Sequence, residues 1–259
     1  MFLRGAAAGV LLLAAFGRTP GARAATDALH VGDRISQTAV AGYLFFAPAP
    51  GDWVRYSVTI DGKPALIKTV GFGRERFGAK DLLYVETRLQ TPPVTGLPVP
   101  SSNQLSADAV EKTFIDADNF GLIDAVYDAV ATLEKVGDSV FYLAAPKRFT
   151  LLPGFPLADT RSGQLTAVQP EPLRVGNKTV QTVHLSVAFA GDAVTGGPTV
   201  EPFGLQSWQS PDVPLGTALM EATLAGHEYR IALMDFGRGA YSSAIPADRS
   251  DLHNPSSPP

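Results

Sequence analysis

The sequence predicts a mainly β protein of the α+β class, built on one large antiparallel sheet. Apolar residues recur at every second position in several segments, as in strands with one buried face. The chain also carries 25 Gly and 21 Pro at short intervals, as turns between many strands require. Because a one-sided sheet buries its apolar face, we expect another layer of the protein to cover that face.

Residues 1–24 are expected to be a signal peptide. Arg4 precedes the apolar run GAAAGVLLLAAF, and small residues flank a cleavage site after Ala24 or Ala25. The run is too short for a membrane span, which takes roughly 20 residues. The chain has no Cys, so it lacks the acylated residue of a bacterial lipoprotein. We therefore expect a periplasmic or secreted protein, exported by the general route, with no stable membrane span in the mature chain.

The remaining chain is expected to form a single domain, residues 25–247, and a disordered tail, residues 248–259. A composition of 45% hydrophobic and 18% charged residues is that of a folded chain with one sizeable core. The tail, DRSDLHNPSSPP, is polar and rich in proline. The net charge of -4 and the scattered basic residues argue against a nucleic-acid surface. Residues 91–103 and 191–204 are expected to be loops.

The domain is expected to open with a β-hairpin. In Asp52–Ile60 apolar and polar side chains alternate, which is typical of a half-buried strand. Asp61 and Gly62 then favour a type I′ turn, which needs positive φ at both central residues, and Ala65–Phe72 returns antiparallel. Asp81–Gln90 is expected to add a third strand on the same pattern.

Further strands are expected in the second half of the chain. Val183–Phe189 alternates in the same way. Leu215–Leu224 and Tyr229–Asp235 are expected to pair as a hairpin around residues 225–228, and Val140–Ala144 reads as another strand.

Two segments are candidates for the helices. Ser106 is placed to cap a helix over Ala107–Phe114. Residues 121–138 fit a helical stripe, although their second half also alternates as a strand would; helix is favoured, and both readings stay open. Asp116–Gly121 begins like a calcium loop, but aromatic residues hold two ligand positions, so a turn is favoured.

No enzyme motif is recognised, and the protein is expected to be neither an enzyme nor a holder of a metal or cofactor. The sequence lacks the Gly-x-Ser-x-Gly elbow, the phosphate-binding GxxxxGK and His-Glu-x-x-His. Its four His residues are dispersed and are expected to be solvent-exposed in strands or turns.

Two segments, Trp53–Leu89 and Arg174–Ala240, resemble a known family of exported proteins. The run VGNKTVQTVHLSV, then Trp208 followed by SPDVPLG, then a hairpin ending in ALMDFGRGA, is similar to the ending of small exported bacterial β proteins related to the LolA-like periplasmic lipoprotein carriers. The resemblance implies that the large sheet is strongly curved and forms an incomplete barrel, with one to three helices packed on or in its concave face. It also implies that this apolar concave face holds acyl chains. Such relatives are often lipoproteins, whereas this chain has no cysteine to acylate.

The resemblance implies a binding protein that shelters a lipid acyl chain or another apolar molecule. Val54 and Leu83 are expected to face inward with the candidate ligand-binding residues, and Tyr56 and Tyr84 are expected at the mouth of a cavity, because a phenol prefers one hydrated end. Alternation by itself indicates only a buried face. A structural or partner-binding envelope protein with a fully packed core and no ligand is therefore the alternative. The candidate ligand-binding residues are Tyr56, Val58, Val85, Leu185, Val187, Met220, Leu224, Ile231 and Leu233.

Overall fold

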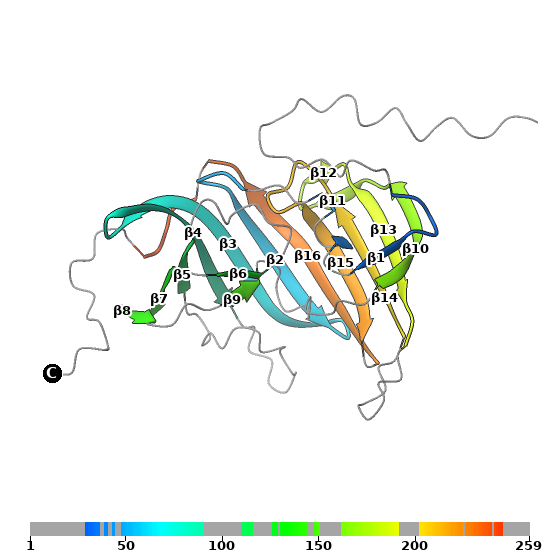
Figure 1. The fold of residues 1–259 in the computed structure, drawn as a ribbon, viewed down its shortest axis with the longest axis horizontal. Helices are drawn as coiled ribbons and strands as arrows, with labels where there is room; N and C mark the ends of the chain where they lie inside the picture. Colours follow the sequence, from blue (N-terminus) through cyan, green and yellow to red (C-terminus); the bar gives the residue numbers. More distant parts are fainter. Residues whose placement is uncertain are drawn as a thin grey trace, which may run out of the picture.

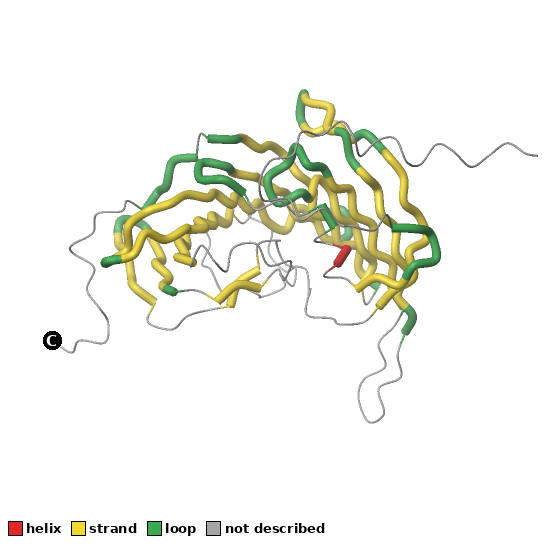
Figure 2. Tube along the Cα trace, turned by 45° about the horizontal axis from the view of Figure 1, so that its top comes forward, coloured by secondary structure: helices red, strands yellow, loops and turns green. Residues whose placement is uncertain are grey.

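A 12-stranded antiparallel sheet dominates the computed structural model, and it bends into an arch that does not close into a barrel (Figures 1 and 2). The expected signal peptide, the loop at 91–103, the calcium-like turn at 116–121 and the tail at 248–259 lie outside the described residues. The structure describes residues 29–36, 39–40, 43–44, 48–90, 110–115, 126–128, 130–143, 148–150, 162–191, 202–224, 226–239 and 241–245.

The large sheet has the order β1-β10-β13-β14-β15-β16-β2-β3-β4-β5-β7-β8. Its strands are β1 (Arg34–Ser36), β2 (Trp53–Ile60), β3 (Lys63–Phe77), β4 (Lys80–Gln90), β5 (Val110–Ile115), β7 (Ala131–Val136), β8 (Ser139–Leu143), β10 (Ser162–Pro170), β13 (Val183–Phe189), β14 (Phe203–Gln209), β15 (Thr217–Leu224) and β16 (His227–Gly237). Two small sheets pair β11 (Leu173–Val175) with β12 (Lys178–Val180) and β6 (Val126–Asp128) with β9 (Arg148–Thr150).

The predicted hairpin turn between β2 and β3 is confirmed. Asp61 has φ 50° and Gly62 has φ 71°, the positive values that a type I′ turn needs. The Asp61 carboxylate also accepts a hydrogen bond from the backbone N–H of Glu228 at 2.9 Å and lies 2.8 Å from Nδ1 of His227. The turn of β2–β3 is thereby tied to the start of β16, which pairs with β2.

The strands predicted at 52–60, 81–90, 140–144 and 183–189 are confirmed as β2, β4, β8 and β13, within one or two residues at their ends. The predicted 65–72 strand extends further, as the 15-residue β3. The C-terminal hairpin is confirmed as β15 and β16, joined through Gly226 at φ 78°.

The expected helices are the main error. Among the described residues only Ala39 and Val40 are helical, and this short turn lies beneath the arch (Figure 2). The helix expected over Ala107–Phe114 is strand β5 where it is described, and the segment at 121–138 contains strands β6 and β7 instead of the favoured helix. β5 lies between β4 and β7 with both faces buried, so its pattern does not alternate in polarity.

The sheet has a separate apolar cluster on each face. The larger cluster follows the concave face from β1 to β5 and includes Val40 of the helical turn. The smaller cluster lies on the convex face of β4, β5 and β7 and contains Tyr84, Phe114 and Ile245. The part of the sheet formed by β4, β5 and β7 is therefore covered on both faces.

Candidate functional site

Four of the nine candidate ligand-binding residues lie in one cross-strand row on the concave face. In a row of this kind, side chains of directly paired residues stand on the same face and contact their neighbours. All members of the row are buried, and only a serine interrupts its apolar character. The row consists of Leu185 on β13, Ser207 on β14, Met220 on β15, Ile231 on β16, Val58 on β2 and Leu66 on β3.

The other candidates extend the same face on both sides of this row. Val187, Tyr56, Leu233 and Val85 are buried members of the same cluster. Leu224, at the end of β15, is half-buried and packs against the margin of the cluster. The structure therefore brings all nine together in one cluster, and Val54, which was also expected to face inward, belongs to it as well.

The two tyrosines do not lie at a hydrated mouth. Tyr56 is fully buried, and its hydroxyl donates a hydrogen bond to the backbone carbonyl of Thr217 at 2.9 Å, so its polar end is satisfied inside the protein. Burial raises the pKa of Tyr56. Tyr84 stands on the opposite, convex face, in the smaller cluster. The expectation of a hydrated cavity mouth is therefore wrong for both residues: the Tyr56 hydroxyl is hydrogen-bonded inside the protein, and Tyr84 packs on the other face of the sheet.

The concave face changes character over β3, β4, β5 and β7. Lys68 follows Leu66 on the same face of β3, directly opposite Tyr56 of β2. In the next row, Val70 pairs with Thr87, which pairs with Glu111. The polar members of this area are all buried, so we name them the polar patch: Lys68, Thr87, Glu111, Thr113 and Thr132.

Lys68 and Glu111 attract one another within the polar patch. Desolvation lowers the pKa of Lys68 to about 8, while the charge of Glu111 acts in the opposite direction. The hydroxyl of Thr113 approaches the Glu111 carboxylate at 3.4 Å. Two opposite charges and several hydroxyl groups thus adjoin the apolar row on one surface.

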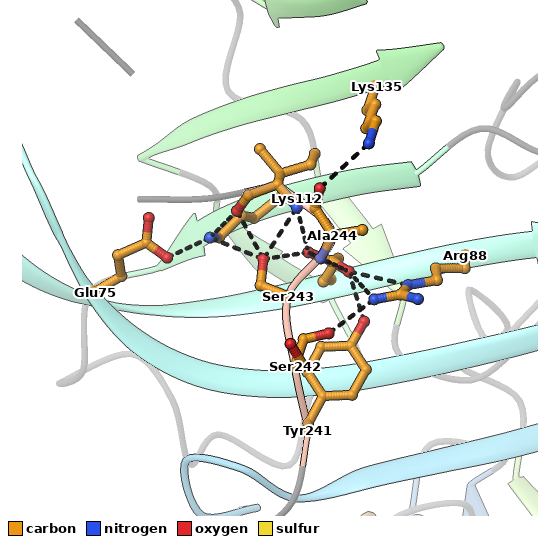
Figure 3. Close-up of polar contacts among 10 residues, drawn as sticks. Glu75, Arg88, Lys112, Lys135, Tyr241, Ser242, Ser243 and Ala244 are labelled. Carbon is orange, nitrogen blue, oxygen red and sulfur yellow. Dashed lines mark hydrogen bonds and ion pairs between the residues drawn. The ribbon is translucent and has the colours of Figure 1, made fainter. Parts of the chain in front are cut away.

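The convex face carries a network that the sequence did not predict. The C-terminal segment Tyr241–Ile245, which we name the strap, lies across β3, β4 and β5 and is held by charged side chains (Figure 3). Glu86, at the middle of β4, accepts hydrogen bonds from the Tyr241 hydroxyl at 2.6 Å and from the backbone N–H of Ala244 at 3.0 Å. Burial alone would raise the pKa of Glu86, but hydrogen bonds from Ser243, Tyr241, Ala244 and Arg88 hold it below its ordinary value.

Lys112 pairs directly with Glu86 across the sheet and binds the same strap. Its ammonium donates to the Ile245 carbonyl at 2.8 Å, to the Ser243 hydroxyl at 3.2 Å and to the Glu75 carboxylate (Figure 3). It also lies 4.1 Å from the ring centre of Tyr84. Arg88 adds a hydrogen bond to the Ser242 carbonyl at 2.9 Å.

The contacts of Lys112 argue against nucleophilic catalysis at Ser243, although Ser–Lys pairs act in some hydrolases. An ammonium has three N–H donors, and here three acceptors take them. No lone pair is left to remove the proton of Ser243. We assign the network to attachment of the strap.

His184 also departs from expectation. His30 and His227 are exposed, as predicted, but His184 is buried and stacks on Trp208, with ring centroids 4.1 Å apart and planes at 5°. Its Nδ1 lies 2.9 Å from a carboxylate oxygen of Glu171. His184 lies on the polar face of β13, as the alternation indicates. It is nevertheless buried, because β14 pairs with β13 and places the ring of Trp208 over it.

Two searches of the described residues gave negative results. No group of three or more His, Cys, Asp or Glu side chains in that part of the chain could hold a metal ion. Nor does any helix among those residues have the length and apolar character to cross a membrane.

Several solved structures are loosely similar to this chain, and three of them are described below. No protein-family model and no curated protein sequence matches the chain. A hypothetical protein from Chlamydia trachomatis is 12% identical over 82% of this chain and 98% of its own, with a TM-score of 0.37. A candidate lipoprotein from Parabacteroides distasonis is 12% identical over 74% and 98%, with a TM-score of 0.37. A candidate exported protein with a YmcC-like fold from Bacteroides fragilis is 10% identical over 75% and 99%, with a TM-score of 0.35.

These likenesses do not establish a shared family, and the resemblance to LolA-like carriers stays a prediction.

Sequence reasoning missed the polar residues of both faces. In the alternation of Asp81–Gln90, Glu86 and Arg88 stand on the face opposite Val85, and that face is covered by the strap. A signal was present in the two sequences LLYVETR and VEKTFI, in which charged residues stand between large apolar ones. Charges in such surroundings point to buried partners, because an unpaired buried charge is costly.

Proposed function

We propose that this is an exported binding protein that shelters an acyl chain or another apolar molecule against the concave face of its sheet. The observation that carries the proposal is the cross-strand row of Val58, Ile231, Met220 and Leu185, whose apolar character is interrupted only by Ser207 between the last two. The sheet is an open arch, so this face is not sealed by strand pairing around a barrel. The charged start, short apolar run and small-residue site of the leader support export.

The burial of the row sets a requirement on ligand entry. Met220 and Leu185 are fully buried and Ile231 is 2% exposed. A ligand therefore reaches them only if part of the protein moves aside. Each Å² of apolar surface that the ligand buries stabilises the complex by about 25 cal/mol, before the cost of opening the protein is subtracted.

The near-complete burial of the same residues favours the second candidate, an envelope scaffold with a packed interior that acts through its surface. A close-packed core leaves no room for an acyl chain. The two candidates differ in what an added large side chain would do on the concave face.

The decisive experiment replaces Val187 or Leu233 with Trp. In a binding protein the Trp occupies space used by ligand, so the melting temperature is kept while binding of a fluorescent fatty acid falls sharply. In a packed scaffold the same changes overfill the core and lower stability by about 1–3 kcal/mol. Ala188→Trp and Met234→Trp are matched controls, because each is the exposed neighbour of a tested position.

Co-purified molecules provide a second test. Native mass spectrometry and organic extraction of the purified protein should reveal bound lipid. Loss of stability in both Trp variants, together with no bound lipid and no binding of the fluorescent fatty acid by the parent protein, would end the binding proposal.

A further inference from the structure

The concave face is divided into an apolar part and a polar part that adjoin without a break. Leu233, Tyr56, Lys68 and Leu89 follow one another across β16, β2, β3 and β4. Lys68 is therefore bordered on both sides by residues of the apolar cluster. A molecule lying along the apolar row would reach the polar patch at one end.

The hydroxyl groups of the patch form a second row. Phe72, Val85, Thr113 and Thr132 pair in succession from β3 to β7. Thr132 is fully shielded from solvent, and its hydroxyl makes no hydrogen bond among the described residues. Buried hydroxyl groups are nearly always hydrogen-bonded, so this group is suited to a partner that enters the face.

The patch and its border carry charges of both signs. Lys68 and Glu111 contribute one charge of each sign, and half-buried Glu134 pairs with Glu111 on the next strand. An anionic group would be attracted by Lys68 and repelled by the carboxylates of Glu111 and Glu134. A cation would be attracted by these carboxylates and repelled by the buried ammonium of Lys68. In a poorly hydrated site either charge would also lose its water. An uncharged group avoids both effects.

We propose that the polar patch binds the head of an amphipathic ligand, and that this head is uncharged and bears hydroxyl groups. The inference rests on the proposed function and adds the chemical class of the ligand. Hydroxyl groups both donate and accept hydrogen bonds, which matches an ammonium donor, a carboxylate acceptor and the threonine hydroxyls. The alkyl chain of the ligand lies along the row that contains Val58 and Ile231.

The test compares three probes that share a 16-carbon chain: a monoacylglycerol, the free fatty acid and the alkyl amine. Each is titrated into the purified mature protein, and its affinity is measured by displacement of a fluorescent acyl probe. We expect the monoacylglycerol to bind about tenfold more tightly than either charged probe. Glu111→Gln should shift the preference toward the fatty acid, and Lys68→Met should shift it toward the amine.

Matched variants separate head-group binding from general effects. Lys63→Met and Glu228→Gln remove the same charges from exposed positions and should leave the ranking unchanged. Thermal melts establish that each variant is folded. If a single variant does not fold, the double variant Lys68→Met with Glu111→Gln removes both charges together and should keep the preference for the uncharged probe.

The possible results are distinct. Equal binding of all three probes, or a ranking that the charge changes do not alter, would overturn the head-group inference and leave the apolar binding site in place. Failure of every probe to bind would overturn the proposed function and this inference together.

Discussion

The ring of Tyr241 lies over the backbone of Gly71, where a side chain of any other residue would stand. A Cβ atom at Gly71 would overlap the atoms of this ring. From that position the Tyr241 hydroxyl reaches Glu86, which pairs with Gly71 on the next strand. Glycine at this position thus determines where the strap begins.

Gly71→Ala should displace the strap. The added methyl group forces the Tyr241 ring away and breaks the hydrogen bond to Glu86, so we expect a loss of about 1–3 kcal/mol in unfolding free energy. Chemical denaturation measures this change. Gly204→Ala is the control, because a Cβ there meets open space. Equal stability of the two variants would show that the strap does not need the Tyr241 position.

Glu86→Ala should be more damaging than the loss of one hydrogen bond. It leaves the N–H of Ala244, the Tyr241 hydroxyl and Arg88 without their carboxylate. Breaking a buried charged network costs on the order of 3 kcal/mol. Hydrogen exchange should show faster exchange at Ala244 and Ile245, while the amides of β13 and β14 keep their protection. Unchanged exchange in the strap would contradict the assigned role.

The stability of the protein should fall in acid through Glu86. The folded pKa of Glu86 is lowered, so its contribution is complete above the unfolded value near 4.3 and disappears as the pH falls through the folded pKa. Glu86→Gln should remove this part of the pH dependence. Denaturant titrations of both proteins between pH 7 and the acid limit of folding measure the unfolding free energy at each pH. If the two plots of free energy against pH are parallel, Glu86 does not contribute to the acid sensitivity.

Lys68 should act at the opposite end of the pH range. Its pKa is lowered to about 8, so between that pH and about 10.5 the unfolded chain holds a proton that the folded chain has released. The unfolding free energy of the parent protein, measured relative to that of Lys68→Met, should therefore rise with pH across this window, by on the order of 3 kcal/mol at most. Unfolding at several pH values checks the slope, and a flat difference would mean that Lys68 is well hydrated.

Gly62→Val should cost more than about 1 kcal/mol, because φ at Gly62 is 71° and a β-branched residue is strained there. No atom lies near the position of the added Cβ, so the effect comes from the backbone. Gly204→Val makes the same change in extended backbone of β14 and should be neutral or stabilising. Equal melting temperatures of these variants would refute the tight turn.

Local signals in the sequence predicted the fold where neighbouring residues decide the structure. The Asp61-Gly62 turn and the alternation of β2 depend on backbone geometry and on one buried face, and both were predicted correctly. β5 was mistaken for a helix because Glu111 is buried on one face and Lys112 on the other. The partners of Lys112 in the strap lie 131 and 133 residues away, so no local pattern contains them.

The apolar half of the candidate site was predictable for the same reason as β2, since Val58, Met220 and Ile231 follow from alternation. The polar patch was not, because it appears only when β3, β4, β5 and β7 are aligned in register. Register between strands is set by pairing and is not visible within one strand.

The order of strands also constrains when the protein can fold. In the large sheet, β2, β3, β4, β5, β7 and β8 form one run of neighbours, and β10, β13, β14 and β15 form most of another. β16 joins the two runs by pairing with both β15 and β2. During synthesis the chain leaves the ribosome with its N-terminus first. The sheet therefore cannot be completed until β16, near the end of the chain, has been made. Pairings of such high sequence separation form slowly. The edges of β2 and β15 stay unpaired until then, and unpaired strand edges of this kind are where aggregation starts in incompletely folded chains.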